Sequence, residues 1–343
     1  MAVRLPIKVK AAAAMSVPLA LLLVVAVIEV GQADRQARLI REQTDLATAT
    51  IGPSGVITAL QNERNFTGMW LLGAPTVIRL PVDDMDEARA QTDAAIFAFE
   101  DEVARKGGET ERAYAPAVAA IEGEGGLRDV RAQVDAYDGP KEIVQYNPTA
   151  DASFKAYSEL IDALADPTTE LSRAIEDGDL RRGVVLTDLA SREVDRIAEA
   201  VRESLLLEVQ GDGRADDPQE VRRASLMQDE TERGHDVIID VASGPYQALG
   251  EKLDSETEAT GVRQIFRDVV STGEVNVPAL LEAVSIEDDE SYYGFINDVS
   301  GLIRERADVL NAEAEASQRL VLLVAALLLL ASALAVPLVS RSI

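Results

Sequence analysis

The sequence predicts an all-α protein, with two stacked four-helix bundles of about eight helices flanked by two transmembrane helices. Aromatic residues make up 4% of the chain, while Ala, Leu, Val, Glu, Asp and Arg predominate, and this composition favours helices over strands. Between the two ends, apolar residues recur at spacings of three and four, and no stretch alternates convincingly like a strand. A long apolar run lies near each end of the chain.

The two apolar runs are long enough to cross a bilayer, at ~1.5 Å per helical residue and ~30 Å of hydrocarbon. Basic residues flank the outer edge of both runs, which by the positive-inside rule places both termini in the cytoplasm. A cleavable signal peptide is the alternative interpretation of the first run. The expected order is a cytoplasmic N-terminus (1–10), a first transmembrane helix (11–33), an extracytoplasmic helical domain (34–319), a second transmembrane helix (320–339) and the start of a cytoplasmic linker (340–343).

Glycine and proline breaks set the helix boundaries in the first half of the extracytoplasmic domain. The expected helices run from the membrane to about Pro75 with a kink at 52–55, from Asp84 to Gly107, over about 110–135 with a break at 123–126, and over a segment with Phe154, Tyr157 and Leu164.

Two Asp-Pro pairs mark helix starts in the second half, because Asp caps helix N-termini and Pro favours the first helical position. The expected helices run from Pro167 to about Val209 with a break at 177–178, from Pro218 to Ala242, over about 245–270, and from Ser291 into the second apolar run.

Composition excludes several classes of function. A net charge of −27 argues against nucleic acid as a partner, since phosphate binding requires a basic surface. The chain has no cysteine and one histidine, His235, expected on a helix surface or flank, so neither a thiolate site nor a His-rich metal site is expected. No catalytic triad, phosphate loop or metal motif is present, and we expect no enzyme activity, no metal and no cofactor.

Residues 56–71 present an apolar helical stripe that contains an arginine. Leu60, Arg64, Thr67 and Leu71 fall on one face at spacings of three and four. A guanidinium cannot be deprotonated to escape burial, so Arg64 requires an anion beside it. Two sources stay open. The protein supplies a carboxylate, from Glu63 or a neighbouring helix, or a ligand supplies the anion, with Thr67 as a second donor.

Four segments in a fixed order carry a family resemblance. They are Leu60-Gln61-Asn62-Glu63-Arg64, Arg89-Ala90-Gln91-Thr92-Asp93-Ala94-Ala95, Tyr157-Ser158-Glu159-Leu160-Ile161 with a later charged helix at 188–207, and the exit helix with its final Ser340-Arg341-Ser342-Ile343. Together they resemble the nitrate- and nitrite-sensing domain of bacterial membrane receptors, in the form carried by actinobacterial sensor histidine kinases.

The resemblance implies a tandem-bundle sensor in the bacterial plasma membrane that binds nitrate or nitrite through arginines. It also implies a homodimer, a lipid bilayer around the two apolar runs, and a cytoplasmic output module of HAMP and kinase type. Arg64 matches the family's signature, although Glu63 and Asn65 stand where family members carry further arginines. Arg196 matches the family pattern more loosely, and Arg233 is a further candidate for binding the anion. For both arginines the alternative is a position on a solvated helix flank.

Two functions follow as hypotheses. The first is the extracytoplasmic sensory region of a transmembrane receptor that binds a small oxyanion at Arg64, Thr67, Arg196 and Arg233. It would pass a helix displacement to the output module. The second is a membrane-anchored helical scaffold or protein-interaction module with no small-molecule ligand.

Overall fold

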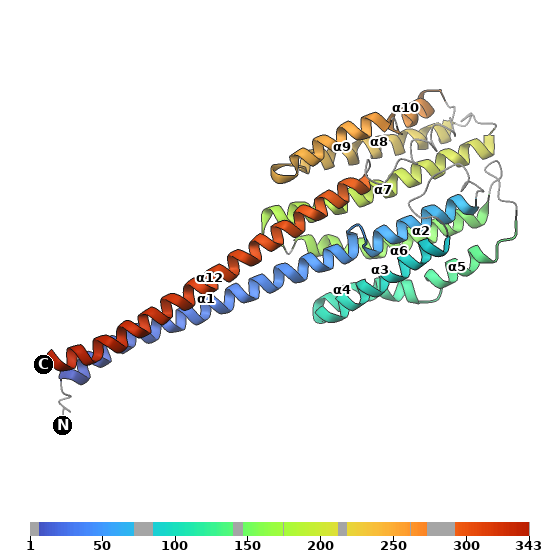
Figure 1. Ribbon diagram of the computed structural model, residues 1–343. Helices are drawn as coiled ribbons and strands as arrows, with labels where there is room; N and C mark the ends of the chain where they lie inside the picture. The colour runs from blue at the N-terminus through green and yellow to red at the C-terminus, as the bar shows by residue number, and fades with distance from the viewer. Residues whose placement is uncertain are drawn as a thin grey trace. The chain divides into compact units, whose positions relative to one another are not determined.

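The computed structural model describes residues 7–71, 85–139, 147–173, 175–211, 218–260, 262–272 and 292–342 (Figure 1). Within these ranges the chain is helical and contains no strand, which confirms the all-α class. The chain divides into two compact units. One consists of Met1–Glu42 and Glu305–Ile343, and the other of Gln43–Arg304.

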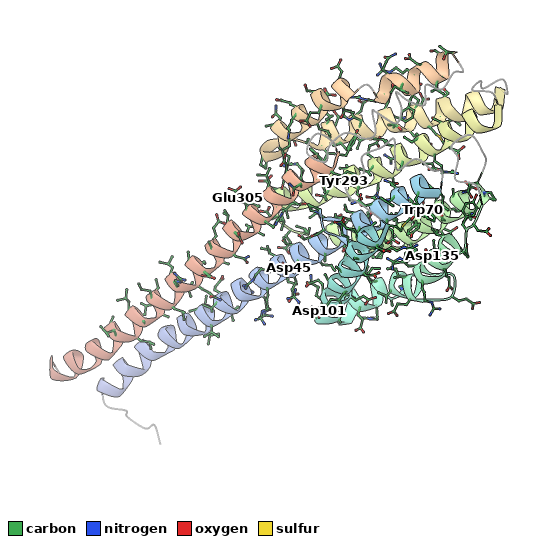
Figure 2. The ribbon with its side chains drawn as sticks, turned by 45° about the vertical axis from the view of Figure 1, so that its right-hand side comes forward. Asp45, Trp70, Asp101, Asp135, Tyr293 and Glu305 are labelled. Atoms are coloured by element: carbon green, nitrogen blue, oxygen red, sulfur yellow. The ribbon has the colours of Figure 1, made fainter. Side chains whose placement is uncertain are left out.

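The first unit holds the N-terminal part of α1 (Ile7–Ile51) and the C-terminal part of α12 (Tyr292–Ser342). Figures 1 and 2 show these two segments side by side, with the helices ending at the same end of the unit. In the part of the chain that the structure describes, one helix is long and apolar enough to cross a membrane. It is α12, whose 18-residue window within Tyr292–Ala331 has a mean hydropathy of 1.8 and is not buried.

The first expected span, residues 11–33, lies within α1, but the side chains of residues 11–23 fall outside the described part of the chain. That span therefore stays a prediction. Residues 1–6 of the expected N-terminal segment and residue 343 of the expected linker also fall outside it, as does the expected helix end near Pro75.

The second unit contains a first group of helices packed around α2 and α6. α2 packs on α3 and α6, and both α4 and α5 pack on α6. The buried face of α6 carries Tyr157, Leu160, Ile161 and Leu164 at helical spacing. The bounds of this group are α2 (Val56–Leu71), α3 (Met85–Lys106), α4 (Gly108–Glu122), α5 (Leu127–Asp135) and α6 (Pro148–Arg173).

A second group is packed around α7 and α8, and α7 also contacts α2 and α6 of the first group. The structure shows two groups of helices joined through α7 (Figure 1), and their expected arrangement as two stacked four-helix bundles stays a prediction. The elements are α7 (Gly178–Gly211), α8 (Pro218–Val241), a 3-10 turn (Gly244–Tyr246), α9 (Gln247–Thr260), α10 (Val262–Thr272) and the first turns of α12.

The Gly-Pro-Ser-Gly segment separates α1 from α2 completely, where the sequence predicted only a kink. A Cβ at Gly55 would lie closer than 3.0 Å to the Thr50 carbonyl and the Gly52 nitrogen, so only glycine fits this turn. The Thr58 hydroxyl donates to the Gly52 carbonyl at 3.0 Å and closes it. This turn sets the first residue of α2 and therefore the position of Arg64 along that helix.

The predicted helix start at Pro167 is wrong, because α6 continues through this proline to Arg173. Tertiary packing outweighs the missing N–H donor: the neighbouring Thr168 is fully buried and lies 3.0 Å from the Tyr114 hydroxyl of α4. The next helix, α7, starts after Asp177 instead, and the Asp177 carboxylate caps it by accepting a hydrogen bond from the Leu180 backbone N–H at 2.8 Å.

Candidate functional site

Two adjacent charged residues of α2 are fully buried and face different neighbours. Glu63 is 0% exposed and Arg64 is 1% exposed. Consecutive helical residues lie about 100° apart, so Glu63 reaches α5 and α6 while Arg64 reaches α6 and α7. The burial of Arg64 predicted from the apolar stripe is confirmed.

Arg64 is held by side chains of α6 and α7. Its Nη1 donates to Ser158 Oγ at 2.9 Å, and its Cζ lies 4.4 Å from the centroid of the Phe154 ring. Its Nη2 lies 2.7 Å from Asp195 Oδ1, which also accepts a hydrogen bond from Gln61 Nε2 at 3.2 Å. Of the two sources of an anion left open by the sequence, the structure shows a carboxylate of the chain. It is Asp195 of α7, and not Glu63.

A second arginine shares the Phe154 ring. The Cζ atom of Arg202, on α7, lies 5.0 Å from the ring centroid, and its guanidinium pairs with Asp151 and Glu203. The ring therefore attracts two cations through its π face, from α2 and from α7.

Both guanidinium groups retain a donor nitrogen without an acceptor. Among the side chains that the structure describes, Arg64 Nη2 and Arg202 Nε are buried and have no hydrogen-bond partner. The short distance from Arg64 Nη2 to Asp195 is therefore an ion pair whose geometry falls outside that of a hydrogen bond. The region between α2, α6 and α7 thus has unused capacity to donate to an oxyanion.

Glu63 belongs to a separate ionic network. Arg131 of α5 binds it bidentately, with Nε–Oε1 and Nη2–Oε2 distances of 2.7 and 2.8 Å, and the Tyr157 hydroxyl donates to Oε1 at 2.7 Å. Burial, together with the Glu63 charge, raises the pKa of Tyr157, which keeps this donor protonated. Arg89 of α3 approaches Glu63 to 4.0 Å and pairs with Asp135. This network ties α2 to α3, α5 and α6.

This network lies near one end of the first group. There, the end of α2 packs against the last turns of α5 and the start of α6, and Figure 2 shows Trp70 and Asp135 in that region. Arg89 Nε is also buried and has no hydrogen-bond partner among the described side chains, but both oxygens of the Glu63 carboxylate are already bound by Arg131, so we interpret the network as structural.

The four residues predicted to bind the ligand are not brought together. Thr67 is buried, and its hydroxyl donates to Met85 Sδ at 3.6 Å, close to Tyr157 on the Glu63 side of α2. Arg196 follows Asp195 on α7 and is turned away from Arg64, toward Glu193 at 2.8 Å. Arg233 is 71% exposed and lies 3.9 Å from Asp229, so it is a solvated helix flank. Arg64 alone of the four lies at the α2–α6–α7 junction.

A second buried polar cluster lies in the other group of helices. His235 is 1% exposed, which corrects the expected surface position, and its Nδ1 and Nε2 lie 2.8 Å from the Tyr292 hydroxyl and 3.0 Å from Asp254. Burial lowers the pKa of His235 despite the opposing Asp254 charge. The ring is therefore a neutral hydrogen-bonding member of the core.

Glu193 of α7 lies in the same group, fully buried beside Gly234 of α8. A Cβ at Gly234 would overlap the Glu193 carboxylate, so the glycine makes room for it. Burial raises the pKa of Glu193 to about 7, although Arg196 opposes the shift. This cluster lies away from Arg64, because α7 turns Asp195 and Glu193 toward different neighbours.

Sequence reasoning missed Asp195, Arg202 and Phe154, and gave Ser158 no role. A signal was present: Ser191, Asp195 and Arg202 repeat at four and seven residues along α7, and Phe154 and Ser158 are four apart on α6. Such spacing aligns polar groups on one helical face. These faces of α6 and α7 meet the face of α2 that carries Arg64 only in the folded chain.

Comparisons with known proteins agree with the helical fold and with the part of the chain that holds the candidate site. The family model described as nitrate and nitrite sensing matches residues 55–268, which include Arg64 and Arg202. A solved structure, the NasR transcription antiterminator, matches with a TM-score of 0.61 at 16% identity, covering 85% of this chain and 80% of that chain. At this identity the likeness shows the fold alone. A comparison with curated proteins finds no match.

Proposed function

The chain belongs to the nitrate- and nitrite-sensing family, and we propose that it binds nitrate or nitrite at the α2–α6–α7 junction, through Arg64. The observation that carries this proposal is the pair of buried guanidinium nitrogens without an acceptor, Arg64 Nη2 and Arg202 Nε, on either side of one junction of helices. A buried unpaired donor is costly unless an acceptor satisfies it.

The chemistry of the junction suits a small planar oxyanion. A guanidinium presents its N–H groups in a rigid fork that pairs with two oxygens of a planar anion. Ser158, whose hydroxyl already contacts Arg64, supplies a further donor. The ring of Phe154 lies 4.4 Å from Arg64 Cζ and helps to hold the guanidinium in place.

We further propose that this sensor is the extracytoplasmic region of a transmembrane, histidine-kinase-type receptor in the bacterial plasma membrane. In this proposal residues 11–33 and 320–339 span the membrane, both termini are cytoplasmic, and a homodimer passes a helix displacement to a HAMP and kinase output module. The support is the apolar stretch of α12 and the resemblance in the sequence. α12 runs without a break from Tyr292 to Ser342, and a continuous helix transmits a displacement along its axis.

Nitrate should stabilise the full chain purified in detergent. At about 100 times its dissociation constant, a ligand that binds only the folded state adds ~2.7 kcal/mol to the free energy of unfolding. Arg64→Ala should abolish the rise in Tm, and Arg64→Lys should reduce it, because an ammonium lacks the planar fork. The matched control is Arg128→Ala on α5, whose side chain is 88% exposed and which should respond like the parent.

Chloride is the control anion. Equal stabilisation by chloride and nitrate, or an unchanged nitrate response in Arg64→Ala, would show that Arg64 does not bind a planar oxyanion.

A scaffold without a small-molecule ligand is the second candidate function. One observation favours it: Arg64 already has a carboxylate counter-ion in Asp195. In that case neither nitrate nor nitrite stabilises the parent, and the Arg64 variants lose stability equally with and without nitrate.

A further inference from the structure

The counter-ion of Arg64 is attached to a different helix from Arg64 itself. We propose that Asp195 competes with the ligand for Arg64, so that nitrate or nitrite binds by replacing the Asp195 carboxylate on the guanidinium. This inference rests on the proposed function, and it assigns the regulation of that site to a residue of α7.

The first step is the charge of the junction. Arg64 is 1% exposed and carries one positive charge, which the Asp195 carboxylate balances at 2.7 Å. The other cation, Arg202, is already paired with Asp151 and Glu203. Burial and the charge of Asp195 raise the pKa of Asp162, which places one more carboxyl group near the pair. A bound anion would thus leave two negative charges on one buried guanidinium unless Asp195 moves away.

The second step is shape. A carboxylate and a nitrate ion are both planar, and both offer two oxygens to one side of a guanidinium fork. They therefore compete for the same N–H groups. The contact of Asp195 with Nη2 is close but lacks hydrogen-bond geometry, so a free anion that can align its oxygens satisfies this nitrogen better.

The third step is access to water. The Asp195 side chain is 21% exposed, whereas Arg64 is 1% exposed. When the two separate, the carboxylate can turn into solvent and be hydrated, while the guanidinium stays buried and keeps the ligand as its counter-ion. The exchange therefore leaves no buried charge without a partner.

Exchange would also change the contact between two helices. Asp195 of α7 connects to α2 through Arg64 and Gln61. Once the carboxylate leaves, the hydrogen bonds that the structure describes between α2 and α7 at this point are those of Gln61 to Ser191. Because α7 contacts both α2 and α6 of the first group, ligand binding is expected to loosen the α2–α7 part of the contact and to leave the α6–α7 part in place.

The test is nitrate titration of the full chain in detergent by calorimetry, with Asp195→Asn, Asp195→Ser and Asp162→Asn. When a competitor occupies a site in most molecules, the ligand binds only the open fraction, and its apparent dissociation constant is the intrinsic constant divided by that fraction. Both Asp195 variants remove the competitor, so the dissociation constant for nitrate should fall roughly tenfold or more. Asp162→Asn removes a carboxyl group nearby, from a residue that the structure shows in no hydrogen bond or ion pair with Arg64 among the described side chains, and should change the constant by less than about threefold.

The serine variant keeps the test decisive if the asparagine variant does not fold. Nitrate binding by the parent, with Asp195 variants that bind no tighter, would overturn the exchange and leave the proposed function standing. Absence of nitrate binding in the parent and in both Asp195 variants would overturn the proposed function, and the exchange with it.

Discussion

Arg131→Ala is expected to lower the free energy of unfolding by about 3–5 kcal/mol, the usual cost of removing one partner from a buried ion pair. The structural reason is Glu63, which is 0% exposed and has both carboxylate oxygens bound by Arg131. Without the guanidinium, the partners of the carboxylate among the described residues are the Tyr157 hydroxyl and the more distant Arg89. Denaturant unfolding of the full chain in detergent measures the change.

Two variants calibrate this result. Arg128→Ala lies on the same short helix with a side chain that is 88% exposed, and should change stability by less than about 0.5 kcal/mol. Tyr157→Phe removes one hydrogen bond to Glu63 and should cost about 1–3 kcal/mol. If Arg131→Ala behaves like Arg128→Ala, the Glu63 network does not hold α2 in place.

Glu193→Gln is expected to stabilise the protein at pH 8 and to have little effect at pH 5. Burial raises the pKa of Glu193 from an ordinary 4.5 to about 7 in the folded chain, so the folded state binds its proton more tightly than the unfolded state. The contribution of this group to stability is complete below pH 4.5 and is lost as the pH rises to about 7. Glutamine is neutral throughout, and the gain at pH 8 should be on the order of 2–3 kcal/mol.

The matched control is Glu199→Gln, an exposed position on the same helix, which should give the same difference from the parent at both pH values. Unfolding curves in urea at pH 5 and pH 8 measure the free energy of unfolding of both variants and of the parent. A Glu193→Gln variant that is less stable than the parent at pH 8 would mean that the ionised carboxylate is the stabilising form, held by Arg196.

The sequence predicts what each helix does by itself, and this covers most of the fold. The apolar stripe of α2 predicts that Arg64 is buried, and the Asp217-Pro218 pair predicts the start of α8; both agree with the structure. The helix start predicted at Pro167 is wrong, because local helix propensity contains no information on the contact of Thr168 with Tyr114 of another helix.

The candidate site is less predictable because its residues come from three helices. Arg64 and its counter-ion Asp195 are 131 positions apart in the chain, and nothing in the periodicity of either helix pairs them. The nearest carboxylate in sequence, Glu63, is on the same helix but faces another way. Arg196 illustrates the same limit: one residue from Asp195 along α7, it belongs to a different cluster.

A crystal structure of the full chain grown with nitrate tests the central claim most directly. We expect a planar, three-oxygen density within hydrogen-bond distance of the Arg64 guanidinium and Ser158 Oγ, with the Asp195 carboxylate turned away from Arg64. Nitrate bound elsewhere, with Asp195 still paired to Arg64, would contradict the assignment of this junction as the sensing site.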